Sequence, residues 1–482
     1  MSTSMPRLKL PSKALLAAAL LAGCASAPDT APAPVQVTDT RWSAGNHSAR
    51  AGAEWWKAFG DPALSGLIDR ALRESPDLAV AAARVREARA FVSAADAALL
   101  PRLDAQLAQQ AQRISAETGR NFPGMPRRSD VTAAGLQLSW EIDLWDRTGS
   151  LATAALAEAR AAGFSEEAAR VSLTAEVARN WFAVRSARET LACLEAEFAA
   201  QMEELALTEQ RFRAGLVDGD PVSQARLLAA QAKAAEADGR RRLQALESAL
   251  RVLIGVSPTV ELPASTVDLA GPATLAATMP DFGPGISSEL LLHRPDVRAA
   301  EQQVDAAVAR EGAARAEYYP RINLVGDAGW QADPAARLGR GSSGFWSLTP
   351  SISLPLFDGG RIAANDEAAQ ARFDLARANY RKAVLNAFRE VDDALVDIRE
   401  IGTQEMLAGK VVEAVRARLA NAEARAKAGL ADSSEVLAAR LDLYLARRTL
   451  AGYGWERRQA AVRLAAATGG GWKQEDKAKS SE

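Results

Sequence analysis

The stretch PDLAVAAARVREARAFVSAADAALLPR at residues 76–102 returns later in the chain as PDVRAAEQQVDAAVAREGAARAEYYPR at residues 295–321. Its first and its last proline are both displaced by 219 positions, so the block repeats without a gap. Such a long period excludes a solenoid, whose repeats are about 20 to 50 residues long. We therefore predict two large, equivalent halves within one pseudo-symmetric fold.

The repeat extends beyond this block. Leu-Trp-Asp at residues 144–146 corresponds to Leu-Phe-Asp at residues 356–358, at an offset of 212. Ala-Gly-Leu at residues 214–216 returns at residues 428–430, at an offset of 214. These small changes of offset indicate loops of different length between otherwise equivalent halves. The expected division of the chain is a first repeat over residues 55–270, a second over 271–470 and a polar tail over 471–482.

Each half contains a long run without proline, over residues 146–213 and 361–427. Apolar residues recur there at steps of three and four, as in Leu173, Val177 and Val184, which is typical of coiled-coil-like helices. At about 1.5 Å per residue, each helix would be roughly 100 Å long. Helices of this length need neighbours along their whole length.

A turn and a partner helix follow each long helix. We expect the partner helices to begin near Pro221 and Glu435, so each half would contain a helical hairpin. The predicted hairpins cover residues 146–255 and 361–468. The predicted fold class is therefore mainly α with a small β part.

The β part comes from four segments in which apolar and polar residues alternate with a period of two. They lie near residues 101–110, 132–145, 320–330 and 345–356. A soluble sheet that buries one face gives the same alternation, so that alternative stays open on pattern alone.

Three details favour strands in a membrane. The apolar face carries no Lys or Arg, whose cost at the bilayer midplane is about 2–4 kcal/mol. The segments have the length of a tilted membrane strand. Trp140, Trp330 and Trp346 lie on the apolar face, where an interfacial aromatic girdle would place them. Pro350 is a counterargument, because it removes a hydrogen-bond donor from its strand.

Four strands cannot close a barrel, and an open edge in lipid leaves backbone groups without hydrogen bonds. The chain must then share strands with copies of itself. Two copies would give eight strands around a filled interior, whereas three would give twelve strands around a possible lumen. The polar inner faces favour the twelve-stranded barrel of a trimer, continued by the long helices as a periplasmic α-helical tube.

The N-terminus has the features of a secretory signal peptide over residues 1–23. Arg7, Lys9 and Lys13 precede a short apolar run at residues 14–22, which is too short to span a membrane. The segment ends in Leu-Ala-Gly-Cys and so resembles a bacterial lipobox, with Cys24 as the acylated residue. Residues 24–54, rich in Pro and Ala, are expected to tether the folded part to the lipid.

Composition excludes several other classes. Cys193 is the only further cysteine, so no internal disulfide is available in the mature chain. His47 and His293 belong to no cluster with metal-ligand spacing. With 58 basic and 60 acidic residues, nothing favours nucleic acid. We find no catalytic motif, and we predict no metal, no cofactor and no enzymatic activity.

Two sets of residues resemble the signatures of TolC-like outer-membrane factors, in the lipoprotein branch of the OprM/NodT type. The first opens the mature chain and the second lies in its middle. They comprise Trp55, Trp56, Phe59, Asp61, Pro62, Leu64, Leu67, Ile68, Pro76 and Asp77, and then Glu289, Arg294, Pro295, Asp296 and Glu301.

This resemblance covers essentially the whole mature chain. It implies a homotrimer in the outer membrane of a Gram-negative bacterium, anchored through Cys24, with a long periplasmic portion. It further implies docking with a periplasmic adaptor and an inner-membrane pump, so that the protein is the exit duct for expelled small molecules. A type I protein-secretion duct and a structural helical envelope lipoprotein remain as alternatives.

The family places its adaptor contacts at the hairpin turns. In this chain the resemblance assigns that role to Arg211, Gly215 and Leu216, and to Arg425, Gly429 and Leu430. The same residues also fit a glycine C-cap with basic residues in the last helical turn, which needs no partner.

Four acidic residues past the turns are candidates for a periplasmic gate, because carboxylate rings at a constriction select ions. They are Asp218, Asp220, Asp432 and Glu435. Helix capping competes with this role: Asp220 precedes Pro221 as an N-cap would, and Asp432 with Glu435 matches a capping box. Ala438 stands where many relatives carry an aspartate, which leaves Glu435 as the better gate candidate in that turn.

Overall fold

The computed structural model describes residues 54–115, 117, 127–258 and 294–470. The chain forms two compact units. Among the described residues, one unit comprises residues 95–154 and 306–374, and the other comprises the remainder. Each unit therefore takes segments from both sequence repeats, and the repeats are not separate globular domains.

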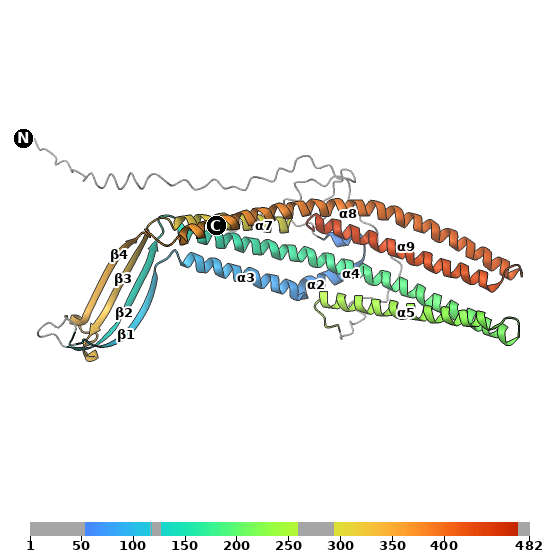
Figure 1. The fold of residues 1–482 in the computed structure, drawn as a ribbon, viewed down its shortest axis with the longest axis horizontal. Coiled ribbons are helices and arrows are strands. Elements are labelled where there is room, and N and C mark those ends of the chain that lie inside the picture. Colours follow the sequence, from blue (N-terminus) through green and yellow to red (C-terminus); the bar gives the residue numbers. More distant parts are fainter. Residues whose placement is uncertain (1–53, 116, 118–126, 259–293, 471–482) are drawn as a thin grey trace, which may run out of the picture. The chain divides into compact units, whose positions relative to one another are not determined.

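The first unit contains one antiparallel sheet in the order β1-β2-β3-β4. Figure 1 shows the four strands side by side in sequence order. Their bounds are β1 Arg102–Arg113, β2 Arg128–Ile142, β3 Arg321–Ala332 and β4 Gly344–Ser353. The strands at the two edges, β1 and β4, are exposed along nearly their whole length.

The strand register brings the alternating apolar residues of the four strands together on one face. Leu103 lies opposite Leu138, Trp140 opposite Leu324, and Ala328 opposite Trp346. The other face is polar: the Gln106 amide donates to the Gln137 carbonyl oxygen at 2.6 Å, and the Ser347 hydroxyl donates to Asp327 at 3.3 Å. The alternation that the sequence predicts is therefore continuous across all four strands.

β2 and β3 join the two repeats at a close approach of glycines. Gly135 lies directly opposite Gly329. A Cβ on Gly329 would come within 2.3 Å of the Ala134 carbonyl oxygen, so no side chain fits there. β2 also begins at Arg128, several residues before the predicted segment, because its pairing with β1 continues as far as Arg113.

The other regular elements of the described chain are helices. The long hairpins are α4 Arg147–Arg213 with α5 Gly219–Leu253, and α8 Arg361–Lys427 with α9 Ser433–Ala467. The other helices are η1 Trp55–Phe59, α2 Pro62–Glu74, α3 Pro76–Ala97, α7 Pro295–Ala316, η2 Ala335–Arg337 and η3 Gly341–Ser343. The predicted starts of the partner helices were wrong by two residues: α5 begins before Pro221 and α9 before Glu435.

The four hairpin helices lie in the order α5, α4, α9, α8 in the second unit (Figure 1). Ion pairs link each neighbouring pair of helices: Arg226 of α5 with Glu209 of α4, Arg448 of α9 with Glu197 of α4, and Arg418 of α8 with Asp442 of α9. The contact between α4 and α9 therefore also joins the two repeats.

The largest core of the second unit contains most of the opening signature of the chain. Trp181 of α4 is 2% exposed, and its indole N–H donates to Asp61 at 2.7 Å. The same carboxylate accepts from the backbone N–H groups of Ala63 and Leu64 as the N-cap of α2. Aspartate is a favoured N-cap because it accepts these otherwise unpaired N–H groups. Asp61 thus fixes α2 against α4.

Candidate functional site

The first hairpin tip closes with a Schellman motif at the end of α4. The N–H of Gly215 donates to the carbonyl oxygen of Phe212 at 2.9 Å, and the N–H of Leu216 donates to that of Arg211 at 2.9 Å. Gly215 has a φ of 73°, in the left-handed region that glycine adopts without strain. The two bonds satisfy carbonyl groups that the helix end leaves free.

The second tip has the same backbone turn. The N–H of Gly429 donates to the Ala426 carbonyl oxygen at 3.0 Å, and the N–H of Leu430 donates to that of Arg425 at 2.8 Å. Gly429 has a φ of 71°. The glycine C-cap interpretation is therefore confirmed at both tips, while contact with an adaptor stays a prediction.

Each tip presents a leucine to solvent. In a Schellman motif the residue after the glycine commonly packs back on the helix. Here Leu216 is 74% exposed and Leu430 is 70% exposed. Both leucines lie beside a left-handed glycine and an arginine, so each tip offers an apolar contact next to a basic group.

An ion pair joins the two tips. Arg211 at the end of α4 contacts Asp432, the N-cap of α9, at 2.6 Å, and it also donates to the Ser433 hydroxyl at 3.2 Å. The two charged residues are 221 positions apart in the chain. Arg211, an adaptor-contact candidate, is thus held by Asp432, a gate candidate.

The Asp432 carboxylate is more acidic than an ordinary aspartate. The Arg211 guanidinium and the Ser433 backbone N–H lower the pKa of Asp432 from 3.8 to about 2. Because this pKa is depressed, the pair contributes its full stability above the ordinary pKa of 3.8, and the contribution is lost as the pH falls toward about 2. The pair therefore stays ionised at neutral pH.

The acidic residues of the first tip correct one capping assignment. Asp218, not Asp220, is the N-cap of α5, and its side chain accepts from the Asp220 backbone N–H at 3.3 Å. Pro221 is consequently the third helical residue, not the first. Asp218 and Asp220 are both exposed.

In the second tip, Asp432 is the N-cap as predicted, but the capping box does not form. The Glu435 carboxylate forms a hydrogen-bonded ion pair with Arg425, which also donates to the Leu430 carbonyl oxygen at 3.2 Å. Asp432 accepts from the N–H of Ser433 at 2.7 Å. Arg425 and Glu435 thus brace the second turn, and Ala438 lies exposed one helical turn further on.

The remaining predicted site residue, Cys24, lies outside the described residues, as do the predicted signal peptide and the polar tail. Within the described ranges, no three metal-ligating side chains lie close enough to hold an ion. In the same part of the chain, no helix is long and apolar enough to span a membrane.

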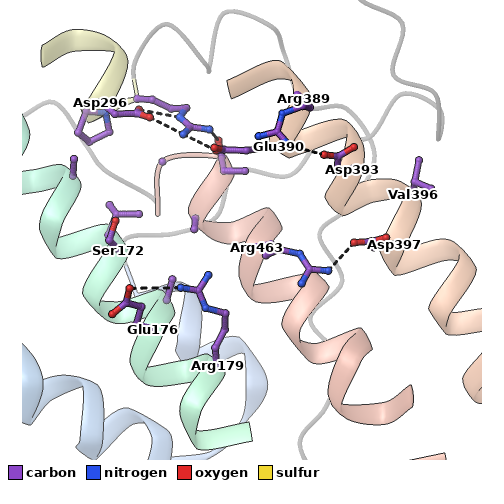
Figure 2. Close-up of a pocket in the computed structure, with 18 residues that line it drawn as sticks. Ser172, Glu176, Arg179, Asp296, Arg389, Glu390, Asp393, Val396, Asp397 and Arg463 are labelled. Carbon is purple, nitrogen blue, oxygen red and sulfur yellow. Dashed lines mark hydrogen bonds and ion pairs between the residues drawn. The ribbon is translucent and has the colours of Figure 1, made fainter. Parts of the chain in front are cut away.

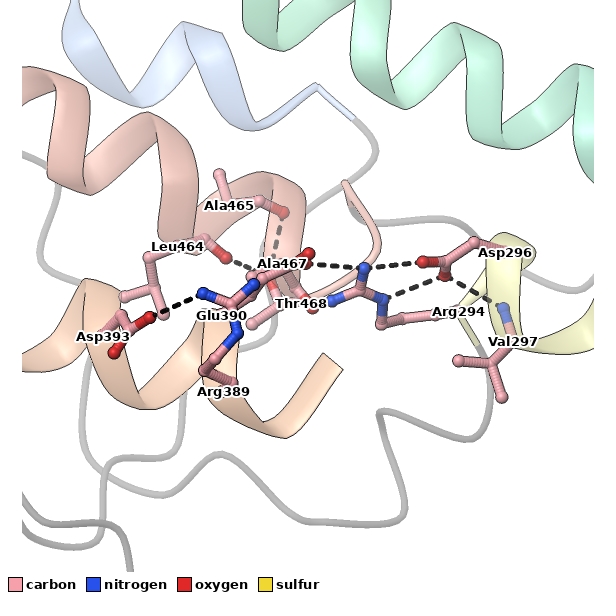
Figure 3. A network of polar contacts seen from close by, with 10 residues as sticks. All are labelled: Arg294, Asp296, Val297, Arg389, Glu390, Asp393, Leu464, Ala465, Ala467 and Thr468. Carbon is pink, nitrogen blue, oxygen red and sulfur yellow. Dashed lines mark hydrogen bonds and ion pairs between the residues drawn. The ribbon is translucent and has the colours of Figure 1, made fainter. Parts of the chain in front are cut away.

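The mid-chain signature has a structural explanation that the sequence did not give. Arg294 is buried, and its guanidinium donates to Asp296 at 2.7 Å, to Glu390 of α8 at 2.8 Å and to the carbonyl oxygen of Ala467 at 2.9 Å (Figure 3). One side chain therefore connects the start of α7, the middle of α8 and the end of α9.

A pocket of about 810 Å³ adjoins this network. Figure 2 shows its charged side chains arranged as pairs. Beside the Arg294 contacts, Arg389 lies 3.1 Å from Asp393 and Arg463 lies 2.7 Å from Asp397. Because each guanidinium already has a carboxylate, the pocket presents no free charge to bind an ionic ligand.

Comparisons with known proteins agree with this architecture. The chain matches the model of the family described as "Outer membrane efflux protein" over residues 67–256 and 286–470. The chain belongs to the outer membrane efflux protein family. Family members are outer-membrane channels and not enzymes, so the protein is placed in the outer membrane as an efflux channel.

Individual members of the efflux family match over nearly the whole chain. The solvent efflux pump outer membrane protein SrpC of Pseudomonas putida is 32% identical, over 96% of this chain and 99% of its own. OprJ of Pseudomonas aeruginosa is 33% identical, over 95% of both chains. The open-state MtrE outer membrane channel of Neisseria gonorrhoeae superposes with a TM-score of 0.78, at 29% identity, over 94% of this chain and 99% of its own.

Proposed function

We propose that this efflux family member is the outer-membrane exit duct of a tripartite pump, working as a trimer that is anchored through an acyl group on Cys24. The observation that carries the proposal is the sheet: four antiparallel strands with one continuous apolar face, one polar face and two free edges. Such a sheet is incomplete alone, because free strand edges in lipid cost several kcal/mol per unpaired group.

Three copies would close twelve strands into a barrel with the apolar face toward lipid. A barrel of this size leaves a lumen, whereas eight strands fill theirs with side chains. The lumen would be lined by Gln106, Gln137 and Asp327, whose side chains hydrogen-bond or carry charge on the polar face. A wide polar lumen passes small molecules without selecting among them, so selection belongs to the inner-membrane pump.

The cargo class follows from the relatives. SrpC is named as the outer membrane protein of a solvent efflux pump. We propose small toxic or drug-like molecules, handed over by a periplasmic adaptor that docks at the hairpin tips. The exposed Leu216 and Leu430 support this docking, because buried apolar anchors commonly carry most of the binding energy of an interface.

The tip proposal is tested with a double variant, Leu216→Asp with Leu430→Asp. Both leucines are exposed, so folding should be unaffected, but a buried carboxylate in a dry interface should cost about 2 kcal/mol or more, equal to roughly a thirtyfold loss of adaptor affinity. We expect a host strain carrying the variant to accumulate a fluorescent efflux substrate nearly as strongly as the deletion strain.

The matched control replaces the same leucines with methionine, which keeps apolar volume and should keep efflux. The amount of variant in the outer membrane is measured by immunoblot in each strain. Wild-type efflux from the aspartate double variant, at equal amount, would rule out the tips as docking sites.

The assembly itself is tested by native mass spectrometry of the detergent-extracted protein. We expect the mass of three chains that each carry acyl groups, and three chains without acyl groups when Cys24 is replaced by alanine. A single chain in both samples would contradict the shared barrel. Three chains without any lipid in the wild-type sample would contradict the Cys24 anchor and leave the trimer standing.

A further inference from the structure

One aromatic contact in the first unit joins the two repeats. Trp145, which follows β2, stacks on Tyr319, which precedes β3, with ring centroids 4.8 Å apart and an interplanar angle of 20°. The indole N–H of Trp145 also donates to the carbonyl oxygen of Pro320 at 2.8 Å. This contact lies next to the ends of β2 and β3 where Ile142 pairs with Ile322.

The two corresponding positions of the other repeat have no such contact within the chain. Phe357 lies 212 positions after Trp145, and Leu100 lies 219 positions before Tyr319. Phe357 is 92% exposed and Leu100 is 66% exposed. They cannot meet in one chain, because they flank β4 and β1, the opposite edges of the sheet, and four strands spaced about 4.8 Å apart separate those edges by roughly 14 Å.

We propose that Leu100 of one chain and Phe357 of a second chain contact each other in the assembled protein. Phe357 of one chain covers Leu100 of a second copy, in the way that Trp145 covers Tyr319 within each chain. This inference rests on the proposed trimer and specifies which side chains form its interface. Around the closed barrel, the Trp145–Tyr319 contact within each chain would then alternate with the Phe357–Leu100 contact between chains.

The same relation fixes how the strand edges pair. Transferring the β2–β3 register by the repeat offsets places Leu348 of β4 opposite Gln109 of β1 in the neighbouring chain, as Leu136 is opposite Ala328 within one chain. It likewise places Ile352 opposite Ala105 and Leu354 opposite Leu103.

This register passes a test that did not enter its construction. Leu348 and Ile352 lie on the apolar face of β4, which ends at Ser353, and Gln109 of β1 shares the face of Leu103 and Ala105. Side chains alternate between the faces along a strand, so a shift by one residue would turn every apolar side chain to the polar face. The transferred register has the parity that keeps both faces continuous across the junction.

Cysteine cross-linking tests the interface in the full-length protein. In a Cys193→Ser background, Leu348→Cys with Gln109→Cys should give covalent dimers and trimers on a non-reducing gel after mild oxidation, because both cysteines of one chain are at opposite edges. The pair Leu348→Cys with Gln110→Cys is the slipped control, whose side chains point to opposite faces, and should remain monomeric.

Leu136→Cys with Ala328→Cys is the intrachain counterpart, and it should form a disulfide without any increase in mass. A second test uses the pair Leu100→Cys with Phe357→Cys, which lies outside the strands. After treatment with a short bifunctional thiol reagent, this variant should also give covalent trimers. If one of the two interchain variants misfolds, the other still tests the interface.

The outcomes separate this inference from the proposed function. Cross-linking of the slipped pair, or of neither pair in a sample that native mass spectrometry shows to be trimeric, would overturn the interface and leave the trimer intact. A monomeric mass for every variant and for the wild-type chain would overturn both. Interchain cross-linking of the two expected pairs alone would establish the contact.

Discussion

Replacing Trp181 with alanine is expected to lower the free energy of unfolding by about 3–5 kcal/mol, the usual cost of removing a large aromatic side chain from a core. Trp181 is 2% exposed and lies in the cluster where α2 meets α4. The truncation also removes the hydrogen bond to Asp61, which then loses one of the donors that hold it as the N-cap of α2. The measurement is the unfolding of the detergent-solubilised protein by circular dichroism.

Two further variants grade this effect. Trp181→Phe keeps most of the volume and removes the indole N–H, so it should cost about 1–2 kcal/mol. Leu445→Ala, on the exposed surface of α9, should change stability by less than about 0.5 kcal/mol. A Trp181→Ala protein as stable as Leu445→Ala would show that the cluster does not hold α2 in place.

Arg294→Met should have the second largest effect, a loss of about 2–3 kcal/mol. The guanidinium is buried and makes hydrogen bonds to two carboxylates and to the end of α9. Breaking a buried ion pair costs about 3–5 kcal/mol, but Asp296 and Glu390 are each almost half exposed and regain water, which reduces the penalty. Arg294→Lys should recover only part of the loss, because an ammonium group cannot reproduce the fork of a guanidinium.

The matched control is Arg389→Met in the same pocket. Arg389 and its partner Asp393 are both largely exposed, so their pair should be worth less than about 1 kcal/mol and should weaken further with salt. The Arg294 contribution should persist at high salt because its charge is shielded from solvent. Equal losses in the two variants would remove the distinction between a buried anchor and a surface pair.

The sequence predicts the hairpins and the sheet well because both depend on local periodicity. A period of two gives the strand faces, and the absence of proline with steps of three and four gives the long helices. The helix starts were less accurate, because Asp218 and Asp220 are equally good caps in the sequence. The structure assigns the N-cap to Asp218.

Contacts between the repeats could not be predicted from the sequence. Arg211 and Asp432 are separated by 221 positions, and no local pattern pairs them. Glu435 was a candidate for both a capping box and a gate, yet its carboxylate forms an ion pair with Arg425. In the first case the arginine pairs with a carboxylate of the other hairpin, and in the second with a carboxylate on the far side of its own turn.

The signature residues were found for one reason and explained by another. Asp61 and Arg294 indicated the family by resemblance, and the structure shows that both hold helix ends in place. Neither lies at the hairpin tips, where the proposed docking occurs. The signature residues therefore reflect what the fold requires. The surface that partners would contact lies at the hairpin tips.

The strand register has a consequence for the evolution and engineering of the chain. Since every strand must keep its parity, insertions and deletions are tolerated only between elements. The repeat offset indeed changes from 219 to 212 across the connections β1–β2 and β3–β4, and to 214 at Gly359 and Gly360, two extra residues with left-handed φ values of 68° and 89°. An epitope inserted beside these glycines, or between β1 and β2, should leave the duplicated scaffold intact. One extra residue inside a strand would instead move the apolar side chains beyond it to the polar face.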